Sequence, residues 1–441
     1  MLFMKKNDIC EIEIVDMGNN GEGIGKLDSV VVFIPYAIKG EIVKTHILKV
    51  NKNFAYGKIV EIIKKNESRI TPPCPYFGKC GGCNLQHISY EKQLEFKTSI
   101  VQTTLQKQLG KDIKVENCVG SDLPFHYRNK MQLPTTIEGI GMYKENSHNI
   151  IIIDNCLLCK NWIVPIIKII KDYIEKNNVN LYDEINHTGL LRHILIRKVD
   201  NSFSITLVIN GDKLPNKNSL IDLLKLSFNE FSVFYCINKI KSNTILTQDI
   251  VCIYGNNTQQ TEDFGIEYYI SPTSFLQINR NIQNKIYSKI LSLIKENDVI
   301  VDAYSGAGLL SAILSKKAKL VYGIEIVKSA TENANNLMKH NKILNVKNIN
   351  GDCAIILPQI IKENNNASII LDPPRKGCDI NVLNAIMQSN PKEIFYVSCN
   401  PSTLARDLKI LQESFNIDLI QPYDMFPQTK HIETLVHLSR K

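Results

Sequence analysis

Residues 299–310 read VIVDAYSGAGLL, and this stretch decides the fold of the carboxyl-terminal part of the chain. Its first residues have the composition of a buried strand, a glycine-containing loop follows, and the pattern then predicts a helix. Gly306 and Gly308 let the backbone approach a ligand closely, and the helix start offers free N–H groups. The order of strand, loop and helix indicates a nucleotide-binding crevice; a tight turn without a ligand is the alternative.

Outward from this stretch, strands and helices alternate to the end of the chain. A helix expected over 279–296 carries Ile282, Ile286, Ile290 and Ile294 at four-residue spacing, which predicts one apolar face. The alternation beyond it predicts an α/β fold with a parallel, doubly wound sheet, as in Rossmann-like domains.

Acidic residues follow the next two predicted strands of this sheet. Glu325 stands nineteen residues after Gly306, at the end of its strand, and Asp352 is expected at the end of the third strand. A carboxylate in this position suits hydrogen bonds to ribose hydroxyls. Together with the glycine loop, these residues favour S-adenosylmethionine over another nucleotide.

Two more loops are expected at the same edge of the sheet. DPPRKG, residues 372–377, follows the fourth strand, and SCNP, residues 398–401, follows the fifth. The carboxyl ends of parallel strands share one edge, where open α/β sheets bind their ligands. Cys399 is therefore expected beside the cofactor.

A thiol at this place has a clear chemical use. Carbon 5 of uracil is not nucleophilic, but a thiolate that adds to carbon 6 makes the ring an enolate whose carbon 5 can attack a methylsulfonium. A base must then remove the carbon 5 proton so that the thiol can leave. Glu433, just before the predicted strand TLVHL, suits that role. Alone, Cys399 would be read as a small buried residue and Glu433 as a surface carboxylate; their combination favours catalysis.

The rest of the chain predicts two further domains. Residues 1–63 have four or five short strands separated by turns such as GNNGEGIGKLD, which indicates a small barrel of the oligonucleotide-binding type. Residues 64–274 predict an α+β central domain, whose helix over about 89–109 could pack on the carboxyl-terminal domain, residues 275–441.

Composition agrees with a folded, multi-domain protein. The chain has 441 residues, 44% of them hydrophobic and 22% charged, and a net charge of +8 that is compatible with a polyanionic partner. No stretch resembles a leader peptide or a membrane span, so we expect a cytoplasmic protein. The 12 cysteines are then expected to be reduced thiols or metal ligands.

Three of these cysteines form a cluster. Cys74, Cys80 and Cys83 have spacing that suits thiolate ligation of zinc or an iron–sulfur centre, and a fourth ligand is missing. Cys156 or Cys159 could supply it. The spacing alone does not distinguish the two metals or the two cysteines.

At this point the sequence resembles the RNA uracil-5-methyltransferases. DPPRKG, SCNP, HIE at 431–433 and SPTSFLQIN at 271–279 match signatures of that family, and residues 1–62 resemble its TRAM domain. The resemblance implies Cys399 as nucleophile and Glu433 as base. It also implies four residues that contact S-adenosylmethionine: Gln277, Tyr304, Glu325 and Asp372.

The same resemblance implies a [4Fe–4S] cluster on Cys74, Cys80, Cys83 and Cys156, with Cys159 unexplained. It implies a structured RNA as partner, 23S ribosomal RNA in preference to transfer RNA, with no membrane and no obligate protein partner. The target uracil must leave its stack, and the segment PFHYRNK, residues 124–130, resembles a family motif on the RNA side.

Two other functions compete with this one. A non-catalytic iron–sulfur protein that binds RNA would need neither Cys399 nor Glu433. A methyltransferase that acts on an exocyclic amine or on a protein would need no thiol adduct.

Overall fold

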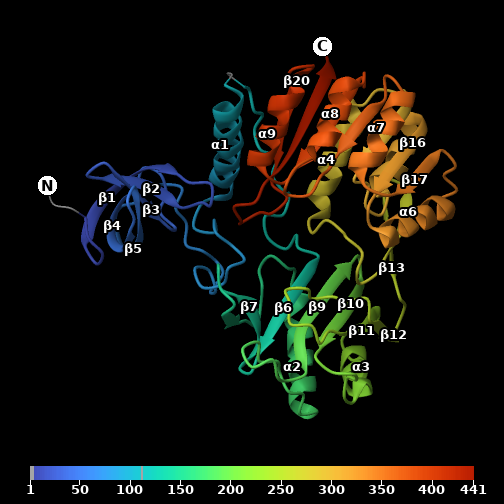
Figure 1. Cartoon of the computed structure of the whole chain (residues 1–441). Coiled ribbons are helices and arrows are strands. Elements are labelled where there is room, and N and C mark those ends of the chain that lie inside the picture. The colour runs from blue at the N-terminus through green and yellow to red at the C-terminus, as the bar shows by residue number, and fades with distance from the viewer. Residues whose placement is uncertain (1–3, 111–112) are drawn as a thin grey trace.

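The computed structural model of the protein describes residues 4–110 and 113–441. They form three parts, which Figure 1 shows as an amino-terminal barrel, a central sheet and a carboxyl-terminal sheet with helices on both faces. This arrangement confirms the predicted fold class. None of the helices in the described residues is long and apolar enough to cross a membrane.

The amino-terminal part is a closed barrel with the strand order β1-β2-β3-β5-β4. Inward-facing residues such as Ile12, Val32 and Val43 are buried, because alternate residues of each strand point into the barrel. One detail differs from expectation: the glycine-rich piece predicted as a turn contains strand β2. A Cβ on Gly25 would collide with Ile12 and the backbone of Glu13, so glycine permits close packing here. The strands are β1 (Ile9–Met17), β2 (Gly23–Leu27), β3 (Val30–Ile34), β4 (Ile42–Val50) and β5 (Phe54–Lys64).

Helix α1 (Tyr90–Leu109) leads from the barrel to the carboxyl-terminal part. It packs against α9 (Pro401–Leu411) and β20 (Phe415–Tyr423), as Figure 1 shows. Val101 and Leu105 of α1 are fully buried and belong to the same core as Leu404 of α9. The helix is thus part of the carboxyl-terminal core, although the whole central part lies between them in sequence.

The central part is a seven-stranded sheet with the order β12-β11-β10-β9-β6-β7-β8. Helices α2 (Ile163–Lys176) and α3 (Lys217–Lys225) pack on it and share its apolar core. A separate hairpin, β13 (Gln259–Asp263) and β14 (Ile266–Ile270), packs against two helices of the carboxyl-terminal part. The sheet strands are β6 (Lys130–Thr136), β7 (Gly139–Tyr143), β8 (Ile150–Ile152), β9 (Leu191–Val199), β10 (Ser202–Ile209), β11 (Phe231–Ile237) and β12 (Ile250–Tyr254).

The carboxyl-terminal sheet has the order β17-β16-β15-β18-β19-β21-β20. Its strands are parallel, except that β21 runs antiparallel to β19 and to β20. The chain proceeds outward from β15 in one direction and from β18 in the other. The crevice between them is therefore the switch point at which such sheets bind ligands. The remaining strands are β15 (Asn297–Ala303), β16 (Ala318–Glu325), β17 (Val346–Asn350), β18 (Ser368–Leu371), β19 (Glu393–Ser398) and β21 (Glu433–Arg440).

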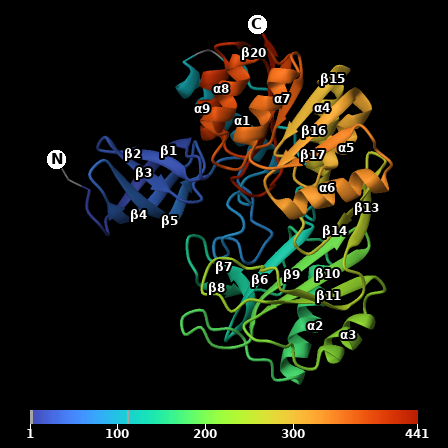
Figure 2. The same ribbon diagram turned by 45° about the vertical axis from the view of Figure 1, so that its right-hand side comes forward.

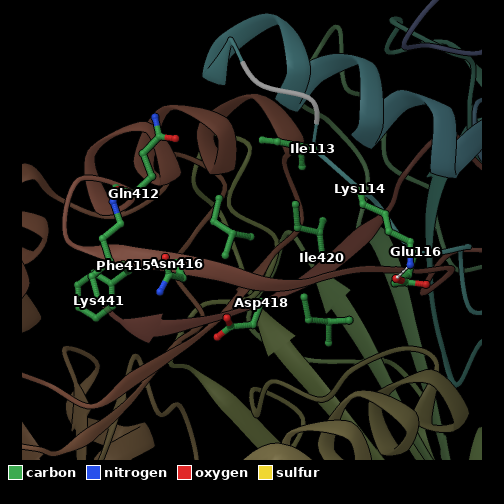
Figure 3. Close-up of a pocket in the computed structure, with 11 residues that line it drawn as sticks. Ile113, Lys114, Glu116, Gln412, Phe415, Asn416, Asp418, Ile420 and Lys441 are labelled. Atoms are coloured by element: carbon green, nitrogen blue, oxygen red, sulfur yellow. Dashed lines mark hydrogen bonds and ion pairs between the residues drawn. The ribbon is translucent and has the colours of Figure 1, made fainter.

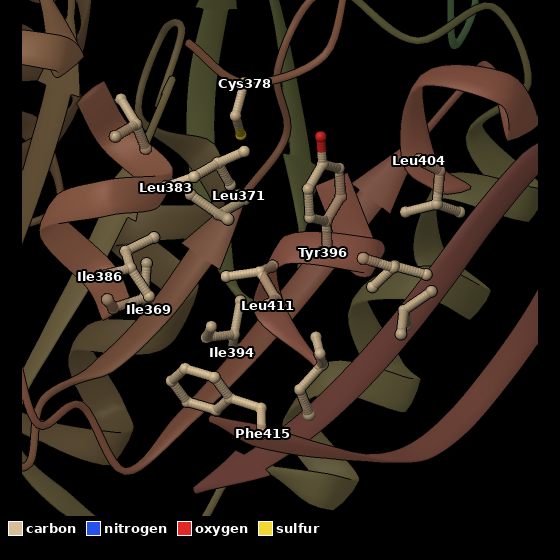
Figure 4. Packing of buried hydrophobic residues seen from close by; sticks show 14 of the residues in the cluster. Ile369, Leu371, Cys378, Leu383, Ile386, Ile394, Tyr396, Leu404, Leu411 and Phe415 are labelled. Carbon is tan, nitrogen blue, oxygen red and sulfur yellow. The ribbon is translucent and has the colours of Figure 1, made fainter. Parts of the chain in front are cut away.

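Helices cover both faces of this sheet, which Figure 2 shows from the side. Strand alternation assigns the faces: Ile300 packs with α4 and α5, whereas its neighbour Val301 packs with α7, α8 and α9. Figure 4 shows the second face, where Leu371 and Tyr396 share a core with Leu383 of α8. The helices not yet bounded are α4 (Arg280–Leu293), α5 (Leu309–Leu314), α6 (Lys328–His340), α7 (Cys353–Glu363) and α8 (Ile380–Gln388).

Candidate active site

Three sequence-predicted residues meet at the edge of the carboxyl-terminal sheet. Asp372 follows β18, Cys399 follows β19, and Glu433 is the first residue of β21. Ser398 of β19 pairs with Thr434 of the antiparallel strand β21. One step outward along both strands, Cys399 therefore stands opposite Glu433. The antiparallel strand is what brings the two side chains together, because a parallel β21 would begin at the other edge.

The charged forms of two carboxyl groups, those of Glu433 and Asp372, are unfavourable at this edge of the sheet. Burial raises the pKa of Glu433 well above its usual range; the nearby Asp372 raises it further and Arg375 lowers it. The Glu433 side chain is buried. Asp372 is exposed at the end of β18, but the protein packed around its carboxylate removes water from it and raises its pKa to about 7. Two carboxylates with raised pKa values beside a thiol are typical of a functional site.

Cys399 is half-buried at this edge of the sheet. Burial raises the pKa of its thiol, the charge on Glu433 raises it further, and Arg375 lowers it. The thiolate is the nucleophilic form of cysteine. Arg375 is therefore the side chain in this structure that favours the reactive form of Cys399.

Replacing Arg375 by glutamine is expected to shift the pH dependence of methyl transfer. Loss of the cation raises the pKa of Cys399, so less thiolate is present at a given pH, and the rising limb of the pH–rate profile moves to higher pH. Single-turnover rates measured across pH would show this shift, with the two enzymes converging at high pH. An unshifted profile would contradict the role given to Arg375.

The loops that follow β18 and β19 are fastened to each other. The Asn400 side chain donates to the carbonyl of Arg375 at 3.2 Å, and the Thr403 hydroxyl donates to the same carbonyl at 3.3 Å. The buried carboxylate of Asp407 accepts from the Tyr396 hydroxyl at 2.6 Å and from the backbone N–H of Cys378 at 2.9 Å. The loop after β18 is therefore held at both ends by groups on or beside α9.

The glycine loop after β15 faces an open crevice. Gly306 has φ +55°, and a Cβ built on it meets no atom within 4 Å. Glu325 accepts hydrogen bonds from the backbone N–H groups of Gly306, at 3.0 Å, and Val327, at 2.8 Å. Each carboxylate oxygen keeps a further lone pair for a ligand hydroxyl. The loop and Glu325 thus suit a nucleoside.

Other residues near the crevice have structural partners. The Tyr304 hydroxyl bonds to the thiols of Cys353 and Cys378, and burial raises its pKa. Asp352 does not end a strand, because β17 stops at Asn350; it caps α7 by accepting from the N–H of Ala354 at 2.9 Å. Asp352 therefore starts a helix, and the prediction that it ends the third strand was wrong.

Gln277 lies in the segment between β14 and α4. Its backbone carbonyl accepts a hydrogen bond from the Asn129 side chain at 2.9 Å, and Asn279 caps α4 two residues later. The segment SPTSFLQIN is thus joined to the motif at 124–130.

The cysteines Cys74, Cys80, Cys83 and Cys156 line one largely apolar recess between the segment before α1 and the central sheet. Cys159 is almost fully buried and does not line it. A side-chain hydrogen bond from Cys159 lowers the pKa of Cys156 to about 6. The structure thus shows that Cys156 lines the recess and Cys159 does not, a distinction that the spacing of the cysteines alone could not make. Within residues 4–110 and 113–441, no three His, Cys, Asp or Glu side chains stand close enough to hold a single metal ion.

A different cavity, of about 370 Å³, lies along β20 and is shown in Figure 3. The described residues that line it include Lys114, Gln412 and Lys441 but none of the predicted site residues. It is therefore separate from the sheet edge that carries Cys399.

Arg375 is a site residue that the sequence reasoning missed. It lies inside the quoted motif DPPRKG, between an acidic residue and a predicted nucleophile, so its charge could have been noticed. Lys97 and Asp424, which hold the segment before Glu433, carried no signal that reasoning along the sequence could use.

The fold defines the class of protein: a doubly wound domain of the methyltransferase type that is joined to a small barrel. The chain belongs to the tRNA (uracil-5-)-methyltransferase family, whose model matches residues 89–441, and a TRAM domain model matches residues 5–60.

Known proteins similar to this chain agree with that family. An uncharacterized RNA methyltransferase of Clostridium tetani is 41% identical over 444 residues, 98% of this chain and 96% of that protein. One from Staphylococcus epidermidis is 34% identical over 456 residues, 100% of this chain and 99% of that protein. The solved tRNA (uracil-54, C5)-methyltransferase of Pyrococcus abyssi, in complex with S-adenosyl-L-homocysteine, aligns with a TM-score of 0.80 at 26% identity, over 97% of this chain and 99% of that one.

Proposed function

We propose that this protein transfers a methyl group from S-adenosylmethionine to carbon 5 of a uridine in RNA through a covalent adduct on Cys399. The observation that carries the proposal is the cross-strand position of Cys399 opposite Glu433, with Arg375 beside both. A nucleophile and a base side by side on neighbouring strands suit a reaction that adds and then eliminates a thiol.

The chain's own residues account for each bond change on the uracil. The Cys399 thiolate adds to carbon 6, and the electron pair of the 5,6 double bond moves toward carbon 5. S-adenosylmethionine would supply the electrophilic methyl group, which carbon 5 would take with that electron pair as the bond from the methyl group to the sulfonium sulfur breaks, leaving S-adenosylhomocysteine. Glu433 then removes the proton from carbon 5, the double bond re-forms, and the bond from carbon 6 to sulfur breaks. Burial suits Glu433 to this step, because a carboxylate with a raised pKa is a stronger base.

For the cofactor we propose contacts from Gln277, Tyr304, Glu325 and Asp372. The open space at Gly306 and the free lone pairs of Glu325 support a nucleoside there. The Tyr304 hydroxyl is engaged by thiols, so its contact would come from the ring or the backbone. We also propose domain limits at 1–63, 64–274 and 275–441.

We further propose that the recess of four cysteines holds a [4Fe–4S] cluster. Four sulfurs in a pocket with Met131, Met142 and Ile153 fit such a group, because thiolates are its ligands and the apolar wall excludes water.

Cys156→Ser is expected to lose most of the iron of anaerobically purified protein, whereas the matched control Cys159→Ser should keep it. Cys156 lines the recess and Cys159 does not. Iron content, expected at about four atoms per chain, and the visible absorption of the cluster measure the difference without reference to activity. Equal iron in both variants would contradict the assignment of the fourth ligand.

The barrel supports RNA as the substrate class. The rings of Phe33, Phe54 and Tyr56 stand 5.5–5.9 Å apart on its outer face. Lys49 pairs across the strands with Tyr56, and Lys58 follows it by two residues, so both lysines share that face. Aromatic rings among lysines suit unpaired bases on a charged backbone. We propose 23S ribosomal RNA as the substrate, on the combination of barrel and cysteine recess. Transfer RNA is the alternative, favoured by the solved archaeal relative.

The proposal is tested with labelled S-adenosylmethionine and unmodified 23S ribosomal RNA or transfer RNA, in parallel. Label in 5-methyluridine is the expected result, and the RNA that carries it identifies the substrate. Label in another nucleoside would indicate amine methylation, which a 5-fluorouracil RNA distinguishes, since only the thiol route traps a covalent complex. No label in either RNA, with cofactor bound, would favour a non-catalytic RNA-binding protein.

A further inference from the structure

The segment that connects β20 to β21, residues 424–432, ends directly before Glu433. Lys97 of α1 lies between the beginning and the end of this segment. The Lys97 ammonium contacts Asp424 at 2.5 Å and donates to the carbonyls of His431 at 2.7 Å and Phe426 at 3.2 Å. Both charged side chains are completely buried. Tyr423 pairs with Glu433; Asp424 directly follows the one, and His431 lies two residues before the other, so Lys97 joins the two strands beside the base.

A second set of bonds fastens the tip of the same segment. Gln428 exchanges two hydrogen bonds with Gln93 of α1, at 3.0 and 3.1 Å, and its carbonyl accepts from the N–H groups of Asn84 and Leu85 at 3.0 and 3.1 Å. These two residues directly follow Cys83 of the cysteine recess. The Gln428 backbone has φ +70°, a conformation that the surrounding bonds must hold. The segment before Glu433 is thus attached to α1 and to the cysteine segment.

A buried ion pair is a weak source of stability, since well-packed apolar residues often replace one without loss. Its geometry gives it another use here. We propose that Lys97 and Asp424 position Glu433 for proton removal, and that Gln93 and Gln428 do the same from the side of the cysteine segment. The proposal rests on the uracil-5-methylation proposed above. It assigns Lys97, 334 residues away in sequence from His431, a role in one step of the reaction.

The two steps of the reaction separate positioning from folding. Formation of the adduct needs Cys399, whose strand β19 makes no bond to Lys97. Breakdown of the adduct needs Glu433 in place. If the segment 424–432 moves, the adduct forms but is released slowly, and methylated RNA accumulates on the enzyme. A role in folding alone would reduce both steps together.

The test is the double variant Lys97→Met with Asp424→Leu, which removes the bonds to His431 and Phe426 but leaves no unpaired buried charge. We expect multiple-turnover methylation to fall on the order of 10- to 100-fold, since small displacements of a reacting group have effects of that size. On a denaturing gel, the fraction of enzyme covalently bound to RNA should rise, while RNA affinity and the melting temperature stay close to those of the natural protein.

Arg69→Met with Glu41→Leu is the matched control. It removes another buried ion pair, 2.6 Å long, that joins the barrel to the cysteine segment and does not touch residues 424–432. It should not raise the adduct fraction. If the double variant does not fold, Gln93→Met is tested instead. It removes the side-chain bonds to Gln428 and retains the charges of Lys97 and Asp424. Normal adduct turnover in a folded Lys97 or Gln93 variant would overturn the inference, whereas absence of adduct and product in the natural protein would overturn the proposed function instead.

Discussion

Replacing Cys399 by alanine is expected to lower methyl transfer by a factor on the order of 10⁴ to 10⁶, the range seen when a covalent nucleophile is removed from an enzyme. Without the sulfur, carbon 5 of uracil does not become a nucleophile, so neither the adduct nor the product forms. The thiol is half-buried and belongs to none of the apolar clusters formed by residues 4–110 and 113–441, so folding should be almost unaffected.

Single-turnover methylation and a denaturing gel with 5-fluorouracil RNA measure this result. RNA affinity should stay close to that of the natural protein, because the charged and aromatic surfaces that would hold RNA are unchanged. Cys236→Ala is the control, since it removes a fully buried thiol of the central sheet, far from β19 in the fold. Undiminished methylation by Cys399→Ala would contradict the assignment of Cys399 as the nucleophile.

Glu433→Gln should slow turnover on the order of 10²- to 10⁴-fold, the contribution typical of a general base. The amide cannot take the carbon 5 proton, so elimination stops after methyl transfer. We therefore expect a methylated RNA that stays covalently attached to Cys399. This pattern differs from that of Cys399→Ala, which forms no attachment. Release of product at the natural rate would rule out Glu433 as the base.

The same substitution should stabilise the protein at neutral pH. Burial and Asp372 raise the pKa of Glu433, so its anion is less stable in the folded protein than in the unfolded chain. Its ionisation in the unfolded chain, above a pH of about 4.3, therefore lowers the free energy of unfolding as pH rises. The glutamine amide of the variant does not ionise in this way. Thermal melting at pH 5 and pH 8 should show a larger gain for Glu433→Gln at pH 8.

Much of the fold was predictable because its signals are local. The barrel strands, the helix with Ile282 and Ile286 on its buried face, and the alternation beyond VIVDAYSGAGLL follow from backbone periodicity and side-chain polarity. The parallel order also predicted that the loops after β15, β18 and β19 share an edge, because the carboxyl ends of parallel strands always do.

The remaining features of the site needed the tertiary structure. Asp352 was predicted to end a strand and instead caps α7, because its side chain can accept from a helix N–H that periodicity does not reveal. Cys156 and Cys159 stand three residues apart, and only the packing around them shows which one faces the recess. The Tyr304 hydroxyl contacts two thiols that lie far apart in sequence, one at the start of α7 and one in the loop before α8.

The sequence by itself determined the class of fold, the motifs at one sheet edge, and the residues proposed as nucleophile and base. Only the tertiary structure decided how Glu433 is held. Lys97 and Asp424 are 327 positions apart in the sequence, and the residues around each of them do not indicate that the two form an ion pair. The physical reason is that secondary structure depends on neighbours along the chain. A buried ion pair depends on which two surfaces the packed core brings into contact, and that is set by the fold as a whole.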